Sequence, residues 1–160
     1  MKLRELTRED ILTEGGVLKA CPPGYEKNLE KLLKRINKVQ ERYGKLQFVS
    51  TSGLRSLLYH IRIYNKKGIT DPKKIPMKSK HLFCQAVDIQ DKDGKLYAWV
   101  QKNEIILEEM GLYYELGTKG WVHFQTVPPG SGKTGFLALV KAPLHTPEDL
   151  SSEGMEIGRA

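Results

Sequence analysis

Apolar residues recur at helical spacing in residues 28–43 and predict an amphipathic helix there. Its apolar stripe consists of Leu29, Leu32, Leu33, Ile36 and Val39. Gly44 follows the stripe and is typical of a residue that ends a helix. A shorter helix is predicted to begin at Thr7, because Asp10 follows three residues later and the pair resembles a capping box.

Further along, strand-like and helical patterns alternate. We predict strands in KLQFVSTS (45–52) and QAVDIQ (85–90), a helix after the Ser52-Gly53 turn and another helix over residues 95–110. The helix after Ser52-Gly53 presents Leu54, Leu57, Leu58 and Ile61 at helical spacing. The helix over residues 95–110 would contact the core through Leu96, Trp99, Val100, Ile106 and Met110.

The remaining segments complete the predicted fold. GLYYEL (111–116) and GWVHFQ (120–125) have the pattern of a hairpin, and residues 65–80 form a long basic loop with two prolines. Residues 144–160 lack apolar periodicity and predict a loose tail. We therefore expect one α+β domain over residues 1–143, with helices packed on one face of a small, mainly antiparallel sheet.

Side-chain alternation in the two later strands makes a geometric prediction. Four apolar residues would face the helices: Val87, Ile89, Val122 and Phe124. Asp88 and His123 would then emerge together on the other face. His81 must come from the loop before the strand and fold back over it. Two imidazoles and one carboxylate, with a fourth position left for water, are the ligand count of a catalytic zinc site.

The other two histidines carry no such pattern. His60 lies within a predicted helix and His145 lies in the tail, and neither has a polar companion in the sequence. We interpret both as structural or solvent-exposed residues.

Composition and charge narrow the class of protein. The chain has 160 residues, 39% hydrophobic and 28% charged, as in an ordinary soluble domain. No stretch is apolar enough to span a membrane, and the charged N-terminus has no signal-peptide core, so synthesis in the cytoplasm is expected. The net charge of +7 favours an anionic partner. Cys21 and Cys84 do not make a disulfide framework, and we expect both to be reduced.

A glycine-rich stretch, VPPGSGKT (127–134), is similar to a phosphate-binding loop. The first glycine of that motif is replaced by Val127, and only 26 residues follow Thr134. A glycine-rich turn after a strand is the simpler interpretation. We therefore expect no nucleotide.

Three ordered motifs resemble one family. They are STSGLRS (50–56), SKHLFCQAVD (79–88) and GWVHFQ (120–125), and together they resemble the zinc peptidases that act on bacterial cell-wall peptides. This family includes D-alanyl-D-alanine carboxypeptidases, vancomycin-resistance dipeptidases and phage L-alanyl-D-glutamate endolysins. The resemblance covers roughly residues 45–127 and implies a hedgehog/DD-peptidase-like fold.

The resemblance also implies roles for single residues. His81, Asp88 and His123 would hold Zn²⁺. Arg55 would bind a carboxylate or polarised carbonyl of the substrate, a role suited to its permanently charged fork. Substrate contacts are also expected from two further residues, Ser79 and Trp121.

The chain departs from the family pattern at two positions. Cys84 stands where the family usually has glycine, and it could be a tolerated substitution, crowd the turn, add a soft ligand or act as a reactive thiol with His81. Gly120 stands where many members have the acid that serves as general base. If residues 118–120 form a three-residue hairpin loop, Glu115 lies opposite His123 and could replace that base. With a four-residue loop, Glu115 faces Val122 instead.

The expected function is zinc-dependent hydrolysis of peptidoglycan stem peptides by a phage-associated lysis or wall-entry enzyme that acts at the cell wall. Anionic wall polymers are expected as further partners, nucleic acid is not, and a monomer is expected. The alternative is a non-catalytic zinc-binding module of the same fold that has structural or wall-binding functions.

Overall fold

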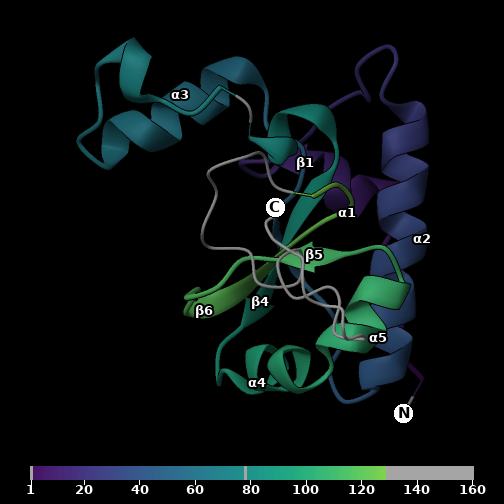
Figure 1. Ribbon diagram of the computed structural model, residues 1–160. Coiled ribbons are helices and arrows are strands. Elements are labelled where there is room, and N and C mark those ends of the chain that lie inside the picture. Colours follow the sequence, from purple (N-terminus) through teal and green to yellow (C-terminus); the bar gives the residue numbers. More distant parts are fainter. Residues whose placement is uncertain (1, 78, 129–160) are drawn as a thin grey trace, which may run out of the picture.

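The computed structural model describes residues 2–77 and 79–128 and has an α+β architecture, which confirms the predicted fold class (Figure 1). The helices are α1 (Arg8–Leu12), α2 (Glu26–Tyr43), α3 (Leu57–Lys66), η1 (Pro72–Lys74), η2 (Lys80–Phe83), α4 (Lys95–Lys102) and α5 (Glu104–Glu109), where η marks a 3₁₀ turn. The strands are β1 (Thr13–Glu14), β2 (Val17–Leu18), β3 (Ser50–Ser52), β4 (Ala86–Asp91), β5 (Tyr113–Tyr114) and β6 (Gly120–Gln125). No helix in the described part of the chain could cross a membrane, because none is both long and apolar enough.

Local sequence signals account for the first two helices. The Thr7 hydroxyl accepts the Asp10 N–H, and the Asp10 carboxylate accepts the Thr7 N–H at 2.7 Å, so the predicted capping box is present. Helix α2 ends at Gly44, whose φ of 71° is a left-handed conformation that glycine adopts without steric cost. The predicted apolar stripe of α2 is buried except for Leu33, which is partly buried.

Four antiparallel strands in the order β3-β4-β6-β5 form the main sheet, and β1 and β2 form a separate small hairpin. The inner face of β4 and β6 carries the residues predicted for it, and all four are fully buried: Val87, Ile89, Val122 and Phe124. They share one core with the apolar stripe of α2 and with residues of α4 and α5. Helix α2 runs along one side of this assembly, on the right in Figure 1. Helix α3 lies away from α2, at the upper left of the same view.

Two predicted elements are shorter or divided in the structure. The strand predicted over residues 45–52 is reduced to β3, because the side chain of Gln40 on α2 accepts the Phe48 N–H at 2.5 Å and takes a donor that a sheet would need. The helix predicted over residues 95–110 is divided into α4 and α5. Asn103 leaves helical geometry there, with φ −124° and ψ 35°, while its side-chain amide donates to the Trp99 carbonyl.

The helix after Ser52-Gly53 differs most from its prediction. It begins only at Leu57, where the Ser56 hydroxyl accepts the Tyr59 N–H, and Leu57 and Leu58 are exposed instead of buried. The only fully buried residue of this helix is His60. The apolar spacing therefore does not predict which side chains of α3 are buried, because this helix lies outside the main core.

Some sequence predictions lie beyond the described residues. Residues 129–134 of the glycine-rich stretch, the tail over residues 144–160 and His145 are among them.

Candidate metal centre

Strands β4 and β6 bring Asp88 and His123 together. Their register pairs Asp88 with His123 directly, and both side chains leave the sheet on the face opposite the core, as the alternation predicted. His81 comes from the η2 turn that precedes β4, also as predicted. The three side chains are buried, with 8% of Asp88, 8% of His123 and 3% of His81 exposed.

The three side chains form a compact cluster of ligand atoms. His81 Nε2 lies 3.3 Å and His123 Nδ1 lies 2.9 Å from the same oxygen, Asp88 Oδ1. One ligand atom from each residue lies within 4.8 Å of the other two. Two ligands of a tetrahedral zinc ion, at bond lengths of about 2.0–2.1 Å, lie about 3.3 Å apart. The two separations from Asp88 Oδ1 are close to this value, so the group could hold a metal ion.

Each imidazole uses its second nitrogen to hold its orientation. His81 Nδ1 lies 2.8 Å from the Gly53 carbonyl oxygen, which can only accept a hydrogen bond, so the proton resides on Nδ1 and the lone pair of Nε2 faces Asp88. His123 Nε2 lies 2.9 Å from Gln125 Oε1. The Gln125 amide nitrogen donates to the Val127 carbonyl at 2.8 Å, which directs Oε1 toward the imidazole.

In the metal-free protein His123 Nδ1 donates a hydrogen bond to Asp88 Oδ1 at 2.9 Å. A metal ion that displaced this proton would meet lone pairs on His81 Nε2, His123 Nδ1 and Asp88 Oδ1, because the second nitrogen of each imidazole keeps its own proton. Such outer hydrogen bonds to a carbonyl or amide oxygen are the usual arrangement around metal-binding histidines.

The ionisation of the metal-free cluster follows from the same contacts. Burial alone would raise the pKa of Asp88, but hydrogen bonds with His123 and His81 hold it well below its ordinary value. Burial lowers the pKa of His81, whereas for His123 the bond to Asp88 outweighs burial and raises the pKa. Asp88 is therefore a carboxylate at neutral pH and one histidine is neutral, which suits metal binding.

Arg55 lies beside the cluster. Its terminal nitrogen is 3.8 Å from the second carboxylate oxygen of Asp88, and its Nε donates to the Ser52 hydroxyl at 3.2 Å. His60 Nδ1 lies 3.4 Å from the guanidinium, and His60 Nε2 lies 2.6 Å from the Pro76 carbonyl. His60 is therefore a buried structural residue, one of the two interpretations given for it, but unlike the prediction it has polar partners and contacts Arg55.

Ser79 and Trp121 occupy different parts of the site. The Ser79 hydroxyl accepts the His81 N–H at 3.4 Å and so caps the turn that carries this ligand. Trp121 lies in β6, two residues before His123 and on the same face, and is 39% exposed. An exposed indole on the face of the cluster provides an apolar contact surface at the edge of the site.

The hairpin between β5 and β6 pairs Glu115 with His123, the register that a loop over residues 118–120 would give, although the chain already turns at Leu116 and Gly117. Tyr114 pairs with Phe124, and the Glu115 N–H donates to the His123 carbonyl at 3.2 Å, so Glu115 lies opposite His123. Gly120 has a φ of 92°, the left-handed conformation such a loop needs. Glu115 is partly buried, and its charge contributes to the raised pKa of His123.

Cys84 lies apart from the cluster. It is fully buried in the apolar core, with a φ of 58°, the only positive φ of a non-glycine residue in the described part of the chain. Burial raises the pKa of its thiol to about 12, so the thiol is protonated at neutral pH. Within residues 2–77 and 79–128 the cluster of metal-ligand atoms does not include its sulfur. A tolerated substitution is the interpretation that fits this environment.

Two functional contacts were not predicted from the sequence. Gln125 shares the strand face of His123, a pattern visible two residues apart, but its bond to the imidazole depends on side-chain rotamers. The Gly53 carbonyl has no side-chain signal at all. Comparison of the chain with protein-family models, with curated proteins and with solved structures finds no match in any of the three.

Proposed function

We propose that this protein is a zinc-dependent peptidase that hydrolyses the stem peptides of peptidoglycan. The observation that carries the proposal is the convergence of His81 Nε2, Asp88 Oδ1 and His123 Nδ1 on one point. Two nitrogen donors and one carboxylate are the ligand set of catalytic zinc, and three protein ligands leave a position for a reactant. The three motifs that resemble cell-wall zinc peptidases supply the substrate class.

A bound zinc ion would supply an activated water and polarise the scissile carbonyl. The chain's own groups account for the remaining steps. Glu115 would accept a proton from the attacking water and return it to the leaving amine, a role consistent with its place opposite His123. Arg55 would bind a substrate carboxylate or carbonyl, because its guanidinium is held beside the cluster by Ser52 and His60. Trp121 would pack against the peptide.

This function implies an enzyme of the hedgehog/DD-peptidase-like fold that acts at the cell wall, in a phage-associated lysis or entry role. A stem peptide would be the substrate, and the protein would act as a monomer.

The decisive experiment measures peptides released from purified peptidoglycan by the zinc-loaded protein, with and without a chelator. Sacculi of several chemotypes are needed, because the stem peptide varies. We expect release that the chelator abolishes, that His123→Ala abolishes and that Glu115→Gln lowers by about 100-fold or more. Glu5→Gln, which changes an exposed glutamate beside α2, is the matched control and should leave release unchanged.

Other outcomes divide the proposal into parts. If Glu115→Gln retains full activity while the chelator and His123→Ala abolish it, the metal assignment stands and Glu115 is not the base. If the zinc-loaded wild type releases nothing from any chemotype, the peptidase proposal is wrong. A non-catalytic zinc-binding module would then be the better description, which the glycine at position 120 also favours.

A further inference from the structure

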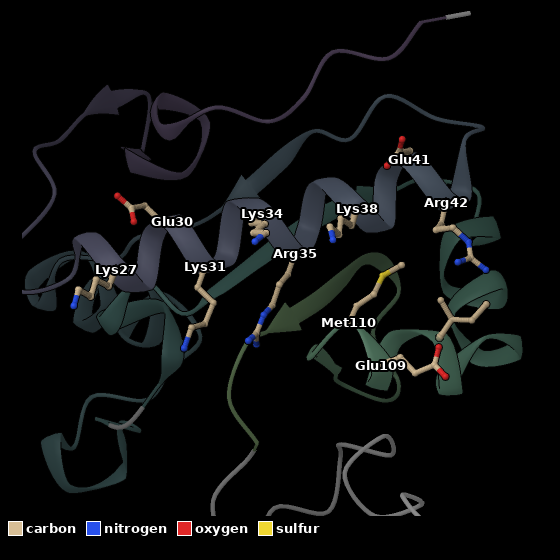
Figure 2. Close-up of a pocket in the computed structure, with 11 residues that line it drawn as sticks. Lys27, Glu30, Lys31, Lys34, Arg35, Lys38, Glu41, Arg42, Glu109 and Met110 are labelled. Carbon is tan, nitrogen blue, oxygen red and sulfur yellow. The ribbon is translucent and has the colours of Figure 1, made fainter.

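The solvent face of α2 carries a row of cations along a groove. They are Lys27, Lys31, Lys34, Arg35, Lys38 and Arg42. The opposite wall comes from α5, and the groove has a volume of about 760 Å³. Figure 2 shows Lys27, Lys31 and Arg35 extending from α2 on the side of α5. Three carboxylates also line the groove, Glu30, Glu41 and Glu109, so the six cations outnumber the anions two to one.

Within the described residues, Arg35 is the one cation of this row with side-chain hydrogen bonds. Arg35 donates to the Gly111 carbonyl at 2.7 Å and to the Thr126 carbonyl at 3.3 Å, and so ties α2 to the hairpin. The four lysines are exposed. Among the described residues, no salt bridge joins any of them to an acidic side chain. Their charges are therefore available to a ligand.

The spacing of the lysines indicates a linear ligand. With a rise of about 1.5 Å per residue, Lys27 and Arg42 lie about 22 Å apart along the helix, with a cation at nearly every turn between them. A single small anion would use one or two of these charges, whereas an extended polyanion could contact all of them.

The lining of the groove discriminates between polyanions. Proteins that bind single-stranded nucleic acids combine a basic groove with aromatic side chains on which bases stack. The described lining consists of charged residues of α2 with Ile106, Glu109 and Met110, and it includes no aromatic side chain. A phosphodiester chain without bases therefore fits the groove better than a single-stranded nucleic acid.

The groove and the metal centre lie on opposite sides of the sheet. The apolar stripe of α2 packs in the same core as Val87 and Val122, whereas Asp88 and His123 point away from that core. A chain bound along the outer face of α2 would leave the metal centre accessible.

We propose that the α2 groove binds a polyol-phosphate polymer of the cell-wall type through Lys27, Lys31, Lys34 and Lys38. This goes beyond peptide hydrolysis, because binding at the groove needs neither metal nor catalysis. Binding at the groove would retain the protein on an anionic wall, and the metal centre would face away from the bound polymer.

The test is binding of a fluorescent polyglycerol-phosphate chain, freed of lipid and substituents, at 50 and 200 mM salt. Four lysine–phosphate contacts correspond to a slope of about −3 in log affinity against log salt, or about 50-fold weaker binding over this range. Replacing all four lysines with glutamine should remove most of this slope and lower the affinity at 50 mM salt by about tenfold or more. The matched control replaces four exposed lysines elsewhere with glutamine: Lys66, Lys73, Lys74 and Lys92.

Several results would overturn the proposal. Equal loss of affinity in the control variant would indicate a general charge effect. Equal or tighter binding of a single-stranded oligonucleotide with the same number of phosphates would indicate a nucleic-acid partner. A wild-type dimer that the α2 variant dissociates would make the groove a contact between two copies. His123→Ala, which disables the metal centre, should bind the polymer like the wild type, so the two proposals fail separately.

Discussion

Replacing Gln125 with leucine removes the acceptor that orients His123. Gln125 is 3% exposed, so water cannot readily replace its oxygen, and the His123 Nε2–H would be left buried without a partner. Such a loss costs about 1–3 kcal/mol. The imidazole could then rotate or change tautomer, and its Nδ1 would no longer be held toward Asp88.

For metal binding the expected loss is larger than that of an ordinary surface change. Removal of an outer hydrogen bond to a metal-binding histidine lowers affinity by about 10- to 100-fold. We therefore expect Gln125→Leu to bind zinc about 10- to 100-fold more weakly than the wild type, measured by competition with a chelating dye at fixed pH. Gln125→Glu keeps the acceptor and should restore the affinity.

The control is Gln90→Leu, the same chemical change at a half-buried position of the neighbouring strand β4. It should leave zinc affinity within about twofold of the wild type, since its side chain has no contact with the ligand imidazoles in the described structure. Wild-type affinity in Gln125→Leu would refute the argument that Gln125 orients His123. An equal loss in Gln90→Leu would show that the effect is not specific to this hydrogen bond.

Three further predictions concern the metal-free protein. Gly53→Ala should lower the free energy of unfolding in denaturant by more than about 3 kcal/mol, because its Cβ would lie 2.4 Å from the Ile11 carbonyl oxygen. A loss below about 1 kcal/mol would contradict this prediction. Cys84→Val should cost about 2 kcal/mol, because a β-branched residue is strained at φ 58°, whereas Cys84→Gly should cost less in the same assay; the reverse order contradicts this. Because the pKa of Asp88 is lowered, its contribution to stability is complete above its unfolded value of about 3.9 and is lost as the pH falls below it. Melting temperatures from pH 5 to pH 2 should therefore fall less steeply for Asp88→Asn than for the wild type, and parallel curves would contradict the assignment.

Local sequence determined the features that depend on neighbouring residues. Helix α2, its stop at Gly44 and the capping box at Thr7 follow from side chains only a few positions apart. The shared face of Asp88 and His123 follows from strand alternation once their strands pair. The register of Glu115 opposite His123 is the one that the sequence predicted for a loop over residues 118–120. These interactions have short range in the sequence, so periodicity and turn chemistry predict them.

Tertiary structure decided everything that needed contacts between distant segments. Gln40 captures the Phe48 N–H and shortens β3, and the Gly53 carbonyl accepts His81 Nδ1 across 28 positions of sequence. The apolar spacing predicted that leucines of α3 are buried, but α3 lies outside the main core and its buried residue is His60, which contacts Arg55. The two strands supply Asp88 and His123, but the hydrogen bonds that aim their lone pairs depend on how backbone and side chains meet in three dimensions. The periodicity of the sequence cannot predict those contacts, because they form only when the chain is packed.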